Sequence, residues 1–159
     1  MCSTEDPEKG PIFDNSDYYS AFERLLDLAR AKRPMRIIAY HLMLTHFHFL
    51  LWPEGDRDTA RFMQWLTGTH AQRWHLRRNS SGCGAVYQAR YKSVLVKNDR
   101  QYFTVWRYIE RNAVTAGLMK RAEDWPWCSA SQGIAPERTF SVDPGPLPRL
   151  DNWIDVLNT

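Results

Sequence analysis

Cysteine is scarce in this sequence of 159 residues, and that scarcity excludes two classes of small protein. The three cysteines, Cys2, Cys83 and Cys128, are odd in number and form no CxxC pair. A disulfide framework needs paired cysteines and a cysteine zinc site needs closely spaced ones, so neither is indicated. The sequence therefore predicts a protein of a reducing, cytoplasmic setting.

Long apolar runs are missing as well, and this argues against a membrane protein. No stretch approaches the roughly 20 apolar residues that a membrane-spanning helix requires. The first ten residues, MCSTEDPEKG, are polar and acidic, whereas a signal peptide starts with basic residues followed by an apolar segment. We expect a cytoplasmic protein without membrane contact, and at this length one domain with a substantial core.

Acidic residues are rare in the middle of the chain. Residues 61–122 contain twelve Lys or Arg and two acids, whereas the remainder contains nine basic residues and sixteen acids. The middle therefore carries about +10 and the flanks about −7. Such an asymmetry is typical of a surface that binds a polyanion such as nucleic acid. Solvated helix faces lined with lysine and arginine give the same pattern, so charge alone leaves both interpretations open.

The spacing of apolar residues predicts a mixture of helices and strands. We expect a helix at residues 17–31, a second that follows a cap at Asp58 or Thr59 and continues to residue 78, and a third at residues 100–116, with Asp99 as its cap and Gly117 at its end. Strands are expected at residues 35–44, 46–52 and 86–96. The first two strands are expected to form an antiparallel hairpin through a turn near Thr45.

Residues 40–52, with the sequence YHLMLTHFHFLLW, combine strand spacing with reactive side chains. Side chains alternate between the two faces of a strand, so His46 and His48 point to one side while Phe47 points into the core. Two neighbouring imidazoles can bind one divalent cation. A buried strand with two hydrogen-bonded histidines is the competing interpretation, and the pair alone does not decide between them.

Two later segments carry further polar side chains. In the third expected strand, Gln88, Arg90 and Lys92 share one face and form a stripe that could hold phosphates. In the third expected helix, the string WRYIERNAVTAGL places Tyr108 and Asn112 one turn apart on one face. A lone tyrosine on a helix is more often a core or interface residue than a catalytic one.

These three segments, taken in order, resemble the corresponding segments of the HUH single-strand nucleases. Within that superfamily the chain is most similar to the IS200/IS605-like Y1 transposases, in the REP-associated tyrosine transposase branch. The resemblance runs from about Pro11 to Gly133. It implies an α+β fold, a ferredoxin-like α/β sandwich with an antiparallel sheet and helices packed on one face. Related proteins begin with a further strand that ends in an Arg-Gly-Asn-like turn, and we expect this chain to lack that strand.

The resemblance also implies a division of the chain. We expect a loose N-terminal segment over residues 1–15 and an IS200-like catalytic domain over residues 16–133. Residues 134–159 are expected to be a proline-containing tail that wraps the surface.

The resemblance further implies roles for individual residues. His46 and His48 would bind a divalent metal, Mg²⁺ or Mn²⁺, with Asn112 as the third ligand. Tyr108 would be the nucleophile that cleaves DNA and forms a 5′-phosphotyrosine. A further group of polar and basic residues would bind the DNA: Gln88, Arg90, Lys92, Arg107, Arg111, Arg73 and Arg77. We expect His41 to be structural and do not assign Glu110 as a base, because it lies on another helix face than Tyr108.

The implied partner is single-stranded DNA with hairpin-forming repeats, and a bound protein would be associated with the nucleoid. A homodimer is compatible with the sequence. Leu44, Thr45 and Ala113 depart from the Pro-Asn and proline positions common in the family. Three functions therefore stay open: a metal-dependent transposase that cleaves and rejoins DNA, a catalytically inactive nucleic-acid-binding protein of the same fold, and a metal-dependent hydrolase without a covalent step.

Overall fold

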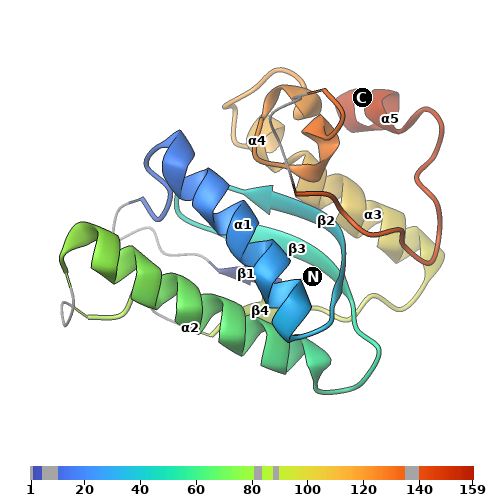
Figure 1. The fold of residues 1–159 in the computed structure, drawn as a ribbon. Helices are drawn as coiled ribbons and strands as arrows, with labels where there is room; N and C mark the ends of the chain where they lie inside the picture. Colours follow the sequence, from blue (N-terminus) through green and yellow to red (C-terminus); the bar gives the residue numbers. More distant parts are fainter. Residues whose placement is uncertain (1, 5–10, 81–83, 88–89, 135–139) are drawn as a thin grey trace.

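A four-stranded antiparallel sheet lies at the centre of the protein (Figure 1). The computed structural model describes residues 2–4, 11–80, 84–87, 90–134 and 140–159. Within them the strands follow the order β2-β3-β1-β4 across the sheet. Their bounds are Cys2–Thr4 for β1, Arg36–Leu42 for β2, Phe47–Trp52 for β3 and Lys92–Ser93 for β4. The expected α+β class with an antiparallel sheet is confirmed.

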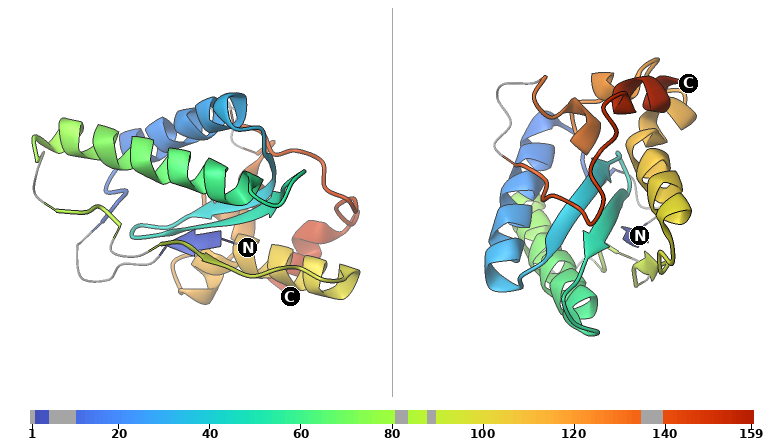
Figure 2. Two further views of the ribbon diagram at one scale, coloured as in Figure 1. Left: turned by 90° about the horizontal axis from the view of Figure 1, so that it is seen from below. Right: turned by 90° about the vertical axis from the view of Figure 1, so that its right-hand side faces the viewer.

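Helices cover both faces of this sheet, so the expectation of helices on one face is wrong (Figure 2). Helices α1 and α2 lie on one side and α3 on the other. The bounds are Ser16–Lys32 for α1, Asp58–Arg78 for α2, Asp99–Glu110 for α3, Asn112–Thr115 for α4 and Trp153–Asn158 for α5. Short 3-10 turns lie at Ala122–Asp124 (η1) and Ser129–Ser131 (η2). No helix of the described ranges is long and apolar enough to cross a membrane.

The alternating side chains of β3 explain the two layers of helices. Phe47 and Phe49 belong to one apolar cluster with Phe22 of α1 and Phe62 of α2. Leu50 belongs to the second cluster, together with side chains of α3 and α5. Because both faces of the strand are apolar at these positions, each face has to be buried by helices that pack against it.

Strands β2 and β3 form the predicted hairpin. Tyr40 pairs with Phe49 and His41 with His48. The turn is closed by the Met43 N–H, which donates to the carbonyl of His46 at 2.8 Å. Since this turn fixes the register, it also fixes which side chains of β3 face α3.

The N-terminal part of the chain is more ordered than expected. Strand β1 lies between β3 and β4, with Cys2 opposite Phe49, so the expected lack of a first strand is wrong. Ile12 and Phe13 are buried, and both N–H groups donate to the carbonyl of Leu44 at 2.8 and 3.0 Å. A strand of three residues shows too few alternations for its period to be detected in the sequence.

The prediction of a strand over residues 86–96 is wrong about the length of that strand. Among the described residues of that range only Lys92 and Ser93 pair, as β4, and their partners are Ser3 and Cys2 of the short strand β1. Arg90 of the polar stripe lies before β4 and outside any strand, whereas Lys92 belongs to β4. Gln88 lies outside the described residues.

The helix expected at residues 100–116 is broken in two at Arg111. That residue has φ −86° and ψ 1° and separates α3 from α4. The N-cap of α3 is Asn98, whose side chain accepts from the Gln101 N–H at 2.9 Å, and not the expected Asp99. The end at Gly117 is as predicted, with a left-handed φ of 72°.

The C-terminal segment is part of the core, so the expectation of a surface tail is wrong. Phe140 is buried in the cluster of α1 and α2. Trp153 and Leu157, both on α5, are buried in the cluster of α3. The prolines between them break regular structure without keeping these apolar side chains at the surface.

Candidate functional site

Two histidine rings lie side by side at the start of β3. His46 directly precedes the strand and His48 is its second residue. Their ring centroids are 5.0 Å apart. Phe47 points the other way and contacts Phe22 of α1 at 5.2 Å between ring centroids. The predicted alternation, with the aromatic residue in the core and both imidazoles on one face, is confirmed.

The region where α3 gives way to α4 brings two more predicted residues to these histidines. The ring of Tyr108 lies 5.6 Å from that of His48, centroid to centroid. The side-chain amide of Asn112 meets His48 Nε2 with its Nδ2 at 3.2 Å. Tyr108 is 45% exposed, whereas His48 is 1% exposed. Residues from two distant segments of the chain therefore converge, with the phenol at the solvent side.

The protonation state of His48 follows from its surroundings. Burial, followed by the neighbouring His46, lowers the pKa of His48 to about 4. The ring is therefore neutral at pH 7, and Nε2 is its acceptor because Asn112 Nδ2 donates to it. The other nitrogen, Nδ1, is buried and has no hydrogen-bond partner among the residues that the structure describes.

These side chains form a donor set that fits a divalent cation. No group of three His, Cys, Asp or Glu side chains suited to a metal occurs in the ranges that the structure describes. A metal at this position would therefore depend on Asn112 as well as on His46 and His48. An amide rotated by 180° presents Oδ1 in place of Nδ2, so Asn112 can offer an oxygen beside the lone pair of His48.

His41 is a third imidazole close to the site but is enclosed by protein. It pairs with His48 across the hairpin and is fully buried. Its ring stacks on Trp125, with centroids 6.0 Å apart and planes at 5°. Burial, followed by His48 and His46, lowers the pKa of His41 to about 3. This environment supports the structural role expected for it.

Two arginines that flank Tyr108 contact the C-terminal helix. Arg107 Nε donates to the carbonyl of Val156 at 2.9 Å, and Arg111 Nη1 donates to that of Leu157. The last carbonyls of a helix have no partner within it, so both arginines cap α5. Their role in DNA binding stays a prediction, whereas their contact with α5 was missed because the sequence gives no sign of that packing.

Two of the remaining predicted DNA-binding residues lie near β4, at different distances from the histidines. Lys92 pairs with Ser3, which pairs with His48, so Lys92 is level with His48 across β1. Two strand spacings put it about 10 Å away on the same face. Arg90 instead lines a pocket of about 540 Å³ together with Gln64 of α2.

The other two, Arg73 and Arg77, lie on the other side of the sheet from Tyr108. Both are exposed in the second half of α2. Helix α2 covers the sheet face opposite α3, so the structure does not bring these arginines together with Tyr108 (Figure 2).

Comparisons with known proteins find a family and two relatives of this chain. Residues 8–112 match the family model described as "Transposase IS200 like". The REP-associated tyrosine transposase of Escherichia coli (strain K12) is 25% identical over 123 residues, which cover 74% of this chain and 67% of that protein. A solved structure of a REP-associated tyrosine transposase bound to a REP hairpin aligns with a TM-score of 0.65 and 18% identity, and covers 91% of this chain and 86% of that chain. At that identity the structural match establishes the shared fold.

Proposed function

Because the chain belongs to the Transposase IS200 like family, we propose that it cleaves and rejoins single-stranded DNA with Tyr108 as its nucleophile. The observation that carries this proposal is the convergence of Tyr108 and Asn112 on His48, at 5.6 Å and 3.2 Å. A tyrosine serving only to fill the core would be buried, whereas Tyr108 is 45% exposed and accessible to a phosphate.

The chemistry would be a transfer of one phosphodiester bond. The Tyr108 oxygen attacks the phosphorus, loses its proton to solvent and becomes a 5′-phosphotyrosine. The 3′ oxygen leaves and takes up a proton. A 3′-hydroxyl of another strand can later attack the phosphotyrosine and release the tyrosine. Because each step exchanges one phosphoester for another, rejoining requires no nucleotide hydrolysis.

We propose that His46, His48 and Asn112 hold Mg²⁺ or Mn²⁺. A bound cation would neutralise charge on the phosphate oxygens and orient the scissile bond. The two nitrogen ligands favour Mn²⁺, and the pKa of about 4 keeps the His48 lone pair available at pH 7.

We propose hairpin-forming single-stranded DNA as the partner. The solved relative is described as bound to a REP hairpin, and the middle of this chain carries about +10. Lys92, level with His48, would contact a phosphate beside the scissile bond. With such a partner the protein would act in the cytoplasm, at the nucleoid.

The test is covalent capture of DNA. Purified protein is incubated with single-stranded hairpin DNA from the flanks of its own gene and with Mn²⁺, and the products are separated by denaturing electrophoresis. We expect a protein–DNA band that Tyr108→Phe abolishes. Tyr102→Phe is the matched control, because Tyr102 lies on the same helix but is 6% exposed and faces Leu147. A band that persists in Tyr108→Phe would refute the assignment of the nucleophile.

The same experiment separates the other functions. Binding of the hairpin without any covalent band would indicate the catalytically inactive binding protein. Cleavage that continues in Tyr108→Phe but requires metal and His48 would indicate the metal-dependent hydrolase.

A further inference from the structure

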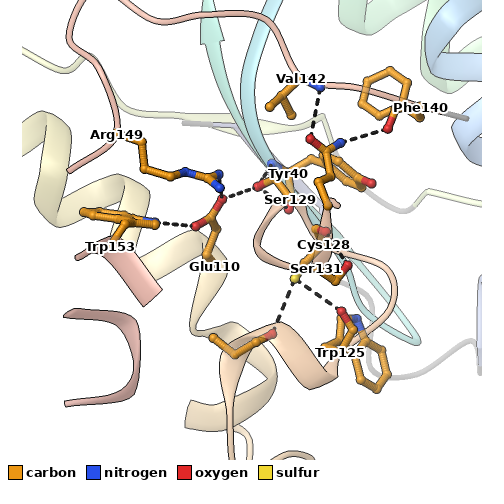
Figure 3. A network of polar contacts seen from close by, with 12 residues as sticks. Tyr40, Glu110, Trp125, Cys128, Ser129, Ser131, Phe140, Val142, Arg149 and Trp153 are labelled. Carbon is orange, nitrogen blue, oxygen red and sulfur yellow. Dashed lines mark hydrogen bonds and ion pairs between the residues drawn. The ribbon is translucent and has the colours of Figure 1, made fainter. Parts of the chain in front are cut away.

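A buried carboxylate lies between the proposed nucleophile and the proposed third ligand. Glu110 is the last residue of α3, two positions after Tyr108 and two before Asn112. Its side chain is completely buried, and Figure 3 shows its polar contacts. A carboxylate in such a place is costly unless hydrogen bonds and an opposite charge compensate it. The contacts of Glu110 therefore need to be accounted for.

Three donors surround this carboxylate. Its Oε1 accepts from Ser129 Oγ at 2.5 Å and from Arg149 Nη2 at 2.8 Å. Its Oε2 accepts from Trp153 Nε1 at 2.6 Å. All three donors follow residue 112, where the match to the family model ends. The part of the chain after residue 112 thus supplies every partner that Figure 3 shows for Glu110.

The network continues from Glu110 into the sheet. Ser129 Oγ also accepts from the Tyr40 N–H of β2 at 3.1 Å. The next residue of β2, His41, pairs with His48. Through Ser129 the end of α3 is therefore connected to the hairpin that carries the histidines.

The helix break makes this connection important for the site. The backbone turns at Arg111, so Asn112 is not held in line with Tyr108 by one continuous helix. Glu110 is the residue immediately before the break, and its carboxylate is fixed to η2 and α5. Because Glu110 is fixed in place, it defines where Tyr108 and Asn112 lie relative to His48.

We propose that Glu110 is a positioning residue, which through Ser129, Arg149 and Trp153 holds Tyr108 and Asn112 against His48. The expected effect of Glu110 on DNA cleavage rests on the proposed function. Its expected effect on the positions of Tyr108 and Asn112 does not. Glu110 contacts neither DNA nor metal. Replacing a buried ion pair by apolar residues of similar volume is often neutral for stability, so a role for this buried charge is sought in fixing one arrangement.

The first test is Glu110→Gln. Glutamine has one acceptor oxygen and an NH₂ group, so at least one of the three donors would face another donor. A misplacement of about 1 Å can reduce a rate about 100-fold. We expect the rate of adduct formation at saturating hairpin DNA to fall roughly 10- to 100-fold, with the Kd for the hairpin unchanged.

The matched control is Glu23→Gln. Glu23 is also a buried carboxylate, 4% exposed, and accepts from Tyr40 Oη at 2.7 Å. It belongs to α1, on the sheet face opposite α3. This variant loses a buried charge of the same kind, so its unfolding midpoint should fall while its adduct rate stays near that of the wild type.

A second readout separates this inference from the proposed function. Nuclear Overhauser effects between the Asn112 amide and the His48 ring report the arrangement in metal-free protein without any DNA. We expect them in the wild type and in Glu23→Gln, and expect their loss in Glu110→Gln. If the wild type forms no adduct, the proposed function fails, while loss of these signals in Glu110→Gln still supports positioning.

The inference is overturned if Glu110→Gln keeps the Asn112–His48 signals, whatever the adduct rate of the wild type. If Glu110→Gln does not fold, Trp153→Phe takes its place, because it removes the indole N–H donor, retains an aromatic ring and leaves the Ser129 and Arg149 contacts of Glu110 in place. Weakened signals in that variant would support the inference, and wild-type signals would refute it.

Discussion

Replacement of His70 by glutamine should change how stability depends on pH. His70 lies on α2, is 6% exposed and contacts Tyr87 Oη through Nδ1 at 2.5 Å. Burial, followed by Arg73 and Arg77, lowers the pKa of His70 to about 3. An unfolded histidine has a pKa near 6.5, so below that pH the unfolded chain binds a proton that the native protein does not. The contribution of His70 to stability is complete above pH 6.5 and is lost as the pH falls towards 3.

The size of the effect follows from this pKa difference. Between pH 8 and pH 5.5, one such histidine reduces the free energy of unfolding by about 1.4 kcal/mol. His41 and His48 have similarly lowered pKa values, about 3 and about 4, so the three together predict a loss of about 4 kcal/mol in the wild type. His70→Gln should lose about 1.4 kcal/mol less than the wild type over the same range.

The measurement is urea unfolding at pH 8 and pH 5.5, followed by tryptophan fluorescence in metal-free buffer. Tyr87→Phe serves as the control, because it removes the hydrogen bond to His70 but keeps the titrating ring. That variant should lose as much free energy between the two pH values as the wild type. Equal losses in His70→Gln and the wild type would refute the reasoning.

Three further predictions concern the site and its support. Asn112→Ala should weaken Mn²⁺ binding at least about tenfold in calorimetry, because a ligand beside His48 is lost; unchanged affinity would contradict its role as a ligand. Lys92→Ala should weaken hairpin binding and reduce the slope of log Kd against log salt by about one, and an unchanged slope would place Lys92 away from the phosphates. Arg111→Ala should lower the free energy of unfolding by about 1–3 kcal/mol through loss of the hydrogen bond to Leu157. If the variant loses hairpin binding but no stability, Arg111 contributes to DNA binding and not to the packing of α5.

Local patterns were enough to predict the part of the site that lies on the hairpin. His46, Phe47 and His48 alternate as expected because a strand has a period of two and one face of β3 must pack against α1. Helix α2 ends at Arg78 as predicted and begins at Asp58, within two residues of the predicted start, although its N-cap is Arg57 and not Asp58 or Thr59. Its extent was predictable because its apolar pattern is long. Such features depend only on neighbouring residues.

Features that depend on distant residues were not predictable in this way. The break at Arg111 occurs without proline or glycine, inside a pattern that continues as a helix. Arg107 and Arg111 resemble free basic residues until α5 is placed beside them. The C-terminal segment was expected at the surface because its prolines are visible in the sequence, whereas the burial of Trp153 depends on the tertiary fold.

The position of the Glu110 partners along the chain has a consequence for synthesis on the ribosome. Residues 129–153 leave the exit tunnel after α3 has been made, so the carboxylate has none of these three donors while translation is still in progress. The anchoring of α3 through Glu110 can therefore be complete only after Trp153 has been synthesised. A nascent chain that stalls before Arg149 would carry Tyr108 on a helix whose buried carboxylate still lacks its arginine partner.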